Sequence, residues 1–226
     1  SRKAGHVPSV AIAGYTNAGK SSILNRITGA GVLVENQLFA TLDPTVRRAE
    51  TADGREYTLV DTVGFVRALP HQLVEAFRST LEEVGDSDVL LHVVDGSHPD
   101  PEGQISAVRE VLASVGGDTL MEIIVINKAD IAEPEVIDRL TRAHKHSVVV
   151  SARTGDGIDR LLEVVAEALP KPDVIVEVLI PYDRGDLVSR LHEYGEILES
   201  EHTEHGTRVR AKVHKHALGD LAAYQV

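Results

Sequence analysis

The residues best suited to chemistry form one glycine-rich stretch near the amino terminus, Gly14-Tyr15-Thr16-Asn17-Ala18-Gly19-Lys20-Ser21. An apolar run, residues 10–13, precedes this stretch, and a helix-like run, residues 22–27, follows it. Glycines let successive backbone N–H groups converge on a phosphate, and the start of a helix adds its positive end. Strand, loop and helix in this order predict a phosphate-binding loop. The alternative is a plain glycine turn between packed elements.

Two side chains of this loop and a second motif predict how a triphosphate and its metal ion are held. We expect Lys20 to bridge the β- and γ-phosphates and the Ser21 hydroxyl to bind Mg²⁺. Asp61 ends a strand-like run, residues 56–60, and is expected to hold the same ion through water. The Gly64 N–H is expected to donate to the γ-phosphate. An Asp-x-x-Gly motif is uninformative alone and gains weight from its order and strand context.

A third motif, Asn127-Lys128-Ala129-Asp130, predicts selection of guanine. The Asp130 carboxylate can accept hydrogen bonds from the ring N–H and the exocyclic amine of guanine, whereas adenine would leave this charge unpaired. We expect the Lys128 stem to lie along the base and Asn127 to tie this loop to the phosphate loop. A backbone N–H of Ser151-Ala152 would reach the guanine oxygen. Plain turn chemistry is disfavoured, because the motifs follow one another at strand carboxyl ends, where ligands bind in such sheets.

The segment Leu38-Phe39-Ala40-Thr41-Leu42-Asp43-Pro44-Thr45 lacks helical periodicity and is typical of a mobile loop. Thr41 is predicted to supply the second Mg²⁺ ligand. Thr45 competes with it, and spacing does not decide between them. Both are ordinary loop hydroxyls if this loop does not close on a nucleotide.

Apolar and amphipathic runs alternate along the chain. Strands are expected at 46–50, 56–60, 89–94, 123–126 and 148–150, and helices at 73–84, 105–115, 134–144 and 158–169. This alternation predicts an α/β fold, a doubly wound and mostly parallel sheet with helices on both faces. Asp53-Gly54 predicts a hairpin turn that makes one strand antiparallel. Asp156 is expected to cap the helix at 158–169.

Pro170-Lys171-Pro172 punctuates the chain, and we expect a domain boundary there, with domains at 1–172 and 173–226. The second domain is predicted to be small and α+β. Its expected elements are a strand at 174–180, a helix at 186–194, a hairpin of 197–202 and 207–213, and a final helix at 217–224.

The composition of the 226 residues bounds the class of protein. This length allows one sizeable core with a small appendage. The absence of Cys excludes disulfides and cysteine-based metal sites. No apolar run approaches the about 20 residues of a membrane span, so a cytoplasmic monomer with no membrane partner is expected. The first residue is Ser, so we expect the chain to start inside a longer protein, after an upstream domain.

A net charge of −12 argues against broad non-specific binding of nucleic acid. One local exception is conceivable at Arg208, Arg210 and Lys212, which would share a strand face. We favour the plainer interpretation, a solvated face opposite buried Val209 and Ala211. Histidines also gather late in the chain, but no metal-ligand spacing supports zinc, and solvated or partner-facing side chains are expected. This group comprises His192, His202, His205, His214 and His216.

Three stretches together resemble the HflX family of translation-factor-related GTPases: the loop at 14–21, the segment 38–45, and Asp61-Thr62-Val63-Gly64-Phe65-Val66-Arg67-Ala68-Leu69-Pro70-His71. The run 72–83 extends the match, which covers about residues 10 to 170. The resemblance implies a GTPase domain that binds GTP and GDP, hydrolyses GTP and associates with the large ribosomal subunit to split or rescue stalled ribosomes. It also assigns the Mg²⁺-binding threonine to Thr41. Family members carry an amino-terminal domain that is absent here, and Ser22 stands where relatives commonly have Thr.

On this basis Lys20, Thr41 and Gly64 are expected to act on the reacting phosphate, and Ser21, Thr41 and Asp61 to hold Mg²⁺. The nucleotide contacts are expected from Gly14, Tyr15, Thr16, Asn17, Ala18, Gly19, Lys20, Ser21, Ser22, Phe39, Ala40, Thr41, Leu42, Asp43, Asp61, Thr62, Val63, Gly64, Asn127, Lys128, Ala129, Asp130, Ser151, Ala152 and Arg153.

Two residues bear on the rate of hydrolysis. Phe65 stands where Ras-like enzymes place a glutamine that orients water, so slow intrinsic hydrolysis is predicted. In similar GTPases an Asn at the position of Asn17 helps to hold K⁺ beside the phosphates, which makes K⁺ a second candidate cofactor. The alternatives are a turn role for Asn17 and a packing role for Phe65.

Three hypotheses follow from these patterns. The first is a Mg²⁺-dependent GTPase that a ribosomal partner triggers. The second is a nucleotide-gated binding protein with negligible turnover, for which Phe65 is the best argument. The third, an ATP-dependent enzyme that shares only the phosphate loop, is opposed by the motif at 127–130.

Overall fold

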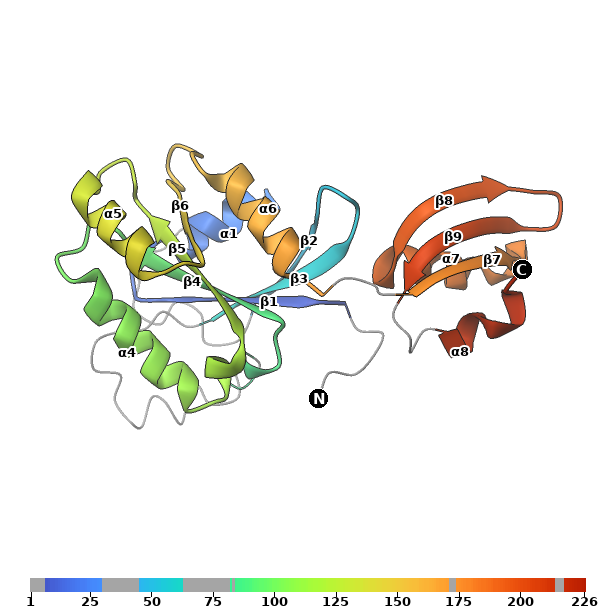
Figure 1. Cartoon of the computed structure of the whole chain (residues 1–226), viewed down its shortest axis with the longest axis horizontal. Coiled ribbons are helices and arrows are strands. Elements are labelled where there is room, and N and C mark those ends of the chain that lie inside the picture. Colours follow the sequence, from blue (N-terminus) through green and yellow to red (C-terminus); the bar gives the residue numbers. More distant parts are fainter. Residues whose placement is uncertain (1–6, 30–44, 63–81, 83, 171–173, 214–217) are drawn as a thin grey trace. The chain divides into compact units, whose positions relative to one another are not determined.

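The structure, a computed structural model, describes residues 7–29, 45–62, 82, 84–170, 174–213 and 218–226 (Figure 1). It divides into two compact units, which we describe separately. One comprises Ser9–Ala49 and Thr58–Leu169, and the other includes Pro170–Val226 with the hairpin tip Glu50–Tyr57. Our division at 172/173 remains a prediction.

The larger unit is built on a six-stranded sheet, counted over the described residues, in the order β2-β3-β1-β4-β5-β6. Its strands are β1 (Ser9–Gly14), β2 (Thr45–Glu50), β3 (Glu56–Asp61), β4 (Val89–Asp95), β5 (Met121–Asn127) and β6 (Ser147–Val149). Its helices are α1 (Lys20–Thr28), α4 (Pro101–Ala113), α5 (Pro134–Ala143) and α6 (Ile158–Ala168), with a short 3₁₀ turn, η1 (Gly117–Thr119). β3, β1, β4, β5 and β6 pair in parallel, and the hairpin strand β2 lies at one edge. The predicted doubly wound fold is confirmed.

Helices cover both faces of this sheet, which explains why its central strands are apolar without alternation. β4 is buried from Val89 to Val94. On one face, α4 packs through Val108 and Leu112 against Ala11, Ala13 and Leu90. Figure 1 shows α4 on one side of the sheet and α1 with α6 on the other. The carboxyl ends of β1, β3, β4 and β5 therefore open onto the same edge.

A polar group is also buried beneath α4. The His92 side chain, 1% exposed, lies 3.0 Å from Glu122 Oε2, and Arg109 of α4 donates to Glu122 Oε1 at 2.6 Å. Burial alone would raise the pKa of Glu122, but hydrogen bonds from His92 and Arg109 outweigh burial and lower this pKa to about 2. The carboxylate is therefore a fixed charge that joins β4, β5 and α4.

The smaller unit is a three-stranded antiparallel sheet in the order β7-β9-β8 with helices on one face. Its elements are β7 (Val174–Ile180), η2 (Tyr182–Arg184), α7 (Gly185–Tyr194), β8 (Glu196–His202), β9 (Thr207–Val213), α8 (Leu218–Leu221) and η4 (Ala222–Tyr224). Alternate residues of β7 and β9, such as Val178 and Ala211, pack against Leu187 and Leu191 of α7. The other face carries the charged residues, as the alternation predicts.

Three boundaries differ from expectation. The helix predicted at 105–115 begins at Pro101, because Asp100 accepts a hydrogen bond from the Gly103 N–H and proline suits the first turn. The final helix at 217–224 is reduced to α8 and a 3₁₀ turn. Asp156 does not cap α6; the cap is Gly157, at φ 79°, where a Cβ would lie 2.1 Å from the Val149 carbonyl.

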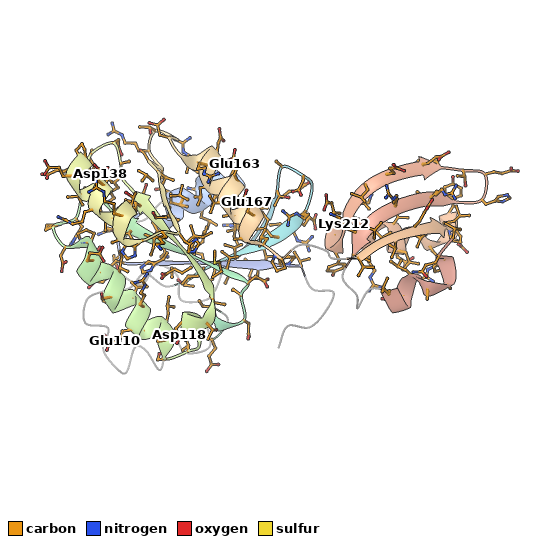
Figure 2. The ribbon with its side chains drawn as sticks, viewed as in Figure 1. Glu110, Asp118, Asp138, Glu163, Glu167 and Lys212 are labelled. Carbon is orange, nitrogen blue, oxygen red and sulfur yellow. The ribbon has the colours of Figure 1, made fainter. Side chains whose placement is uncertain are left out.

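Much of the acidic surplus lies on exposed outer surfaces of helical segments. Glu110, Asp118, Asp138, Glu163 and Glu167 illustrate this in Figure 2. Among the described residues, no helix is both long enough and apolar enough to cross a membrane.

Candidate functional site

The loop after β1 has the backbone geometry that its glycines allow. Gly19 precedes α1 at φ 103°, and a Cβ there would lie 2.2 Å from Asn127 Nδ2. A Cβ on Gly14 would lie 2.6 Å from the Val93 carbonyl. Asn17 is exposed and also left-handed, at φ 68°, a conformation that Asn tolerates better than most residues. The loop is therefore shaped by close approach of β4 and β5, and the turn role of Asn17 is observed.

Lys20 is buried at the first position of α1 and joins this loop to the end of β3. Its ammonium donates to Asp61 Oδ1 at 2.9 Å and to the Thr62 carbonyl at 2.6 Å. The side chains of Lys20 and Asp61 are only 9% and 7% exposed, so each charge has a close partner out of water. The Thr62 hydroxyl in turn donates to the Ile12 carbonyl at 2.8 Å, which fixes β3 beside β1.

Asn127, at the end of β5, connects three loops through one buried amide. Its Nδ2 donates to the Ala18 carbonyl of the phosphate loop at 3.0 Å, and its Oδ1 accepts from the Ala152 N–H at 3.0 Å. Ala152 therefore already has an acceptor for its N–H, and a guanine oxygen would share that donor or use a neighbouring one. The loops at 14–21, 127–130 and 151–153 meet at one edge of the sheet.

The Asp130 carboxylate is oriented by the next loop. Ser151 Oγ donates to Asp130 Oδ1 at 2.9 Å, and Arg153 Nη1 lies 3.5 Å from Asp130 Oδ2. The Arg153 side chain is 83% exposed, so this ion pair contributes little, whereas Ser151 is buried and holds the carboxylate firmly. The Thr154 N–H also donates to Ser151 Oγ, at 3.2 Å.

Lys128 has a left-handed backbone, at φ 64°, and an anchored side chain. Its ammonium donates to Asp95 Oδ2 at 3.0 Å, and Asp95 Oδ1 accepts from the N–H and the hydroxyl of Ser97. Burial alone would raise the pKa of Asp95, but these hydrogen bonds lower it below its usual value. Asp95 thus stays ionised beside Lys128.

Sequence reasoning missed two residues of this edge, Asp95 and Arg26. Arg26 of α1 donates from Nε to the Ala152 carbonyl at 2.7 Å and from Nη2 to the Arg153 carbonyl at 2.8 Å. The available signals were weak: a strand-ending Asp-Gly-Ser for Asp95 and a basic last helical turn for Arg26. Both patterns are also common without any site.

The remaining predicted residues divide into two groups. Thr16, Ser21 and Ser22 lie half-buried in the loop and in the first turn of α1, while Tyr15 packs its ring against the cluster of Ala11 and Leu90. The rest lie outside the described residues: Phe39, Ala40, Thr41, Leu42, Asp43, Val63, Gly64 and Phe65, with most of the helix expected at 73–84. Thr45 begins β2.

The oxygen donors near Lys20 suit a hard divalent cation. The Ser21 hydroxyl follows Lys20 directly, and the Asp61 carboxylate contacts it, so a hydroxyl and a carboxylate flank the start of α1. Mg²⁺ prefers such oxygen ligands over nitrogen or sulfur. Elsewhere in the described part of the chain, no three His, Asp or Glu side chains gather as metal ligands.

Two family models match the chain. Residues 9–128 match the model described as 50S ribosome-binding GTPase, and residues 136–219 match the model of the HflX C-terminal domain. The matched ranges span most of both compact units.

Curated relatives give the same result. A GTPase HflX from Lacrimispora saccharolytica is 44% identical over 221 residues, 98% of this chain and 52% of that protein. The GTPase HflX of Escherichia coli is 41% identical over 94% of this chain and 50% of its own length. The chain thus spans about half the length of these relatives.

Solved structures are similar in fold. A GTP-binding protein from Sulfolobus solfataricus in complex with GDP has a TM-score of 0.57 and 27% identity, covering 71% of this chain and 52% of that one. A variant of Era from Aquifex aeolicus, bound to GDP and AlF4⁻, has a TM-score of 0.57 and 26% identity, covering 74% and 58%.

Proposed function

The chain belongs to the HflX family of GTPases, and from that premise we propose that it binds and hydrolyses GTP in a Mg²⁺-dependent manner. We propose further that it acts as a switch triggered by the large ribosomal subunit. The observation that carries the nucleotide proposal is the position of Asn127, whose amide joins the phosphate loop to the two base loops.

Selection of guanine is supported by the surroundings of Asp130. Its carboxylate is held by Ser151 Oγ, so it is aligned before any base binds. A carboxylate accepts hydrogen bonds and donates none, which matches the ring N–H and exocyclic amine of guanine. Adenine offers no such pair of donors. Ala152 and Arg153 would close the pocket on the side of the guanine oxygen.

The phosphates would take Lys20 as their main cationic partner. The ammonium that now contacts Asp61 and the Thr62 carbonyl would turn to phosphate oxygens, while the N–H groups of residues 14–21 surround them. Ser21 and Asp61, with Thr41, would hold Mg²⁺, which when bound supplies positive charge to the phosphate oxygens. The roles of Thr41 and Gly64 rest on the sequence pattern.

Hydrolysis by the chain alone is proposed to be slow. Phe65 cannot orient a water molecule, so a partner would have to complete the site. K⁺ held by Asn17 would add charge beside the phosphates. The partner proposed is the large ribosomal subunit, because the matched family is described as 50S ribosome-binding. We also propose that the protein is a cytoplasmic monomer.

The test is the GTP hydrolysis rate of the chain in K⁺ and in Na⁺, with and without large ribosomal subunits. Stimulation by subunits would support the switch. GDP binding that resists excess ATP, with no hydrolysis under any condition, would instead support the second candidate, a nucleotide-gated binding protein for which Phe65 argues. Equal competition by ATP would refute the guanine assignment.

A further inference from the structure

We propose that Asp95 is a positioning residue for the guanine base, acting through Lys128. The proposal rests on the proposed function, since it assumes that the edge formed by residues 127–130 binds a base. Asp95 ends β4 directly beside Asn127 in the register of β4 and β5. None of the sequence motifs includes Asp95.

The Asp95 carboxylate is held rigidly by its own turn. Oδ1 accepts from the Ser97 N–H at 2.9 Å and from the Ser97 hydroxyl at 2.6 Å, and Oδ2 is left to Lys128 at 3.0 Å. The Gly96 N–H donates to the Asn127 carbonyl at 3.0 Å, and a Cβ on Gly96 would lie 3.0 Å from that oxygen. The turn after β4 therefore supports the loop after β5 at backbone and side chain.

Lys128 is consequently fixed at both ends. Its carbonyl accepts from the N–H groups of Ile131 and Ala132, each at 3.0 Å, and this keeps its left-handed backbone in place. Its ammonium is held by Asp95. The apolar stem between these two anchors has a defined course, and a free lysine would lose considerable rotamer freedom on becoming a wall of the base pocket. Anchoring the stem in advance removes that cost from binding.

An electrostatic argument makes the opposite prediction, which makes the proposal testable. A carboxylate near a nucleotide diphosphate repels it, so if Asp95 only added charge, removing Asp95 would tighten GDP binding. If Asp95 positions Lys128, removal weakens GDP binding, and an amide that still accepts a hydrogen bond restores part of it.

The experiment measures GDP affinity and dissociation rate with a fluorescent, ribose-modified GDP, together with thermal unfolding. We expect Asp95→Ala to raise the Kd for GDP about tenfold and Asp95→Asn about threefold. Asp100→Ala is the matched control, because Asp100 lies in the same connection and caps α4 without contacting Lys128. It should lower the unfolding temperature and leave the Kd unchanged.

A second background separates positioning from general damage. In Lys128→Met, which keeps an apolar stem without the ammonium, Asp95→Ala should change the Kd less than about twofold. A full tenfold loss in that background, or an unchanged or lower Kd in Asp95→Ala alone, would overturn the proposal. Failure of the unmodified chain to bind GDP would refute the proposed function itself, and the inference with it.

Discussion

In the parallel sheet, polar side chains gather where strands end and bond to segments far away in the chain, whereas in the three-stranded sheet they lie along the strands and face their neighbours. Asn127 reaches back to Ala18, and Lys20 reaches forward to Asp61. In the smaller unit, Arg208 pairs with Glu177 at 3.0 Å and Arg210 lies 3.9 Å from Glu199, each across one strand pairing.

Burial gives these two arrangements different weights. Asn127 is 3% exposed, so a lost partner leaves a polar group out of water. Arg208 and Glu177 are 51% and 46% exposed, and water replaces a lost partner at little cost. The row of cations on β9 is also matched by carboxylates on both flanking strands, which disfavours it as a binding surface for nucleic acid. Concentrated polar bonding builds a site, and distributed bonding builds a solvated face.

Removing the Asn127 amide should break this comparison most severely. Asn127→Ala orphans the Ala18 carbonyl and the Ala152 N–H, so we expect the Kd for GDP to rise about 1,000-fold. Equilibrium binding of fluorescent GDP measures this loss. A Kd within tenfold of the unmodified chain would show that the three loops keep their positions without this side chain.

Changing the charge of Asp130 should reduce affinity less and change specificity. Asp130→Asn replaces an acceptor with a donor opposite the guanine amine, so we expect the Kd for GDP to rise about 100-fold. Xanthosine diphosphate, which carries a carbonyl in place of that amine, should bind the variant better than GDP does. Competition titrations with both nucleotides check this, and loss of both equally would contradict the assignment of Asp130.

The buried Glu122 cluster should respond to acid. Because the pKa of Glu122 falls from 4.5 to about 2 in the fold, its ionised form stabilises the protein above pH 4.5, and that contribution is lost as the pH falls toward 2. Allowing for the water that reaches it, Glu122→Gln should cost about 1–2 kcal/mol at pH 7 and flatten the acid dependence. Urea unfolding between pH 3 and 7 measures both, with exposed Glu110→Gln of α4 as the control that should change neither (Figure 2).

The smallest effect is expected on the open face of the three-stranded sheet. Arg208→Ala should change the free energy of unfolding by less than about 0.5 kcal/mol. The neighbouring Val209→Ala, which faces the core, should cost about 2 kcal/mol. Thermal or urea unfolding compares the two. An arginine effect as large as that of the valine would mean that this face is not merely solvated.

Periodicity and spacing predicted most of the fold and the convergence of the loops. The apolar run of β4 and the order of motifs at 14–21, 61–64 and 127–130 leave few topologies, because right-handed crossovers bring strand carboxyl ends to one edge. These signals are local and strong. The parallel sheet, the hairpin strand and the added α+β unit follow from them.

The sequence did not reveal contacts that depend on exact backbone courses. Asp95 looks like an ordinary turn residue until the register of β4 and β5 places it beside Lys128. Asp156 looks like a helix cap, but the close Val149 carbonyl requires glycine one residue later. The partners of Arg26 and Arg208 lie on distant or neighbouring strands and loops, and no spacing rule specifies them.

The single amide of Asn127 has a consequence for local unfolding. Because the same side chain holds both the phosphate loop and the loop at 151–153, an opening that frees one of them removes an anchor of the other. Backbone amides of the two loops should therefore exchange with deuterium at correlated rates, and the Ala152 N–H should report the opening of both. The pocket opens as one cooperative unit, so nucleotide release requires a concerted loosening rather than the independent motion of any one loop.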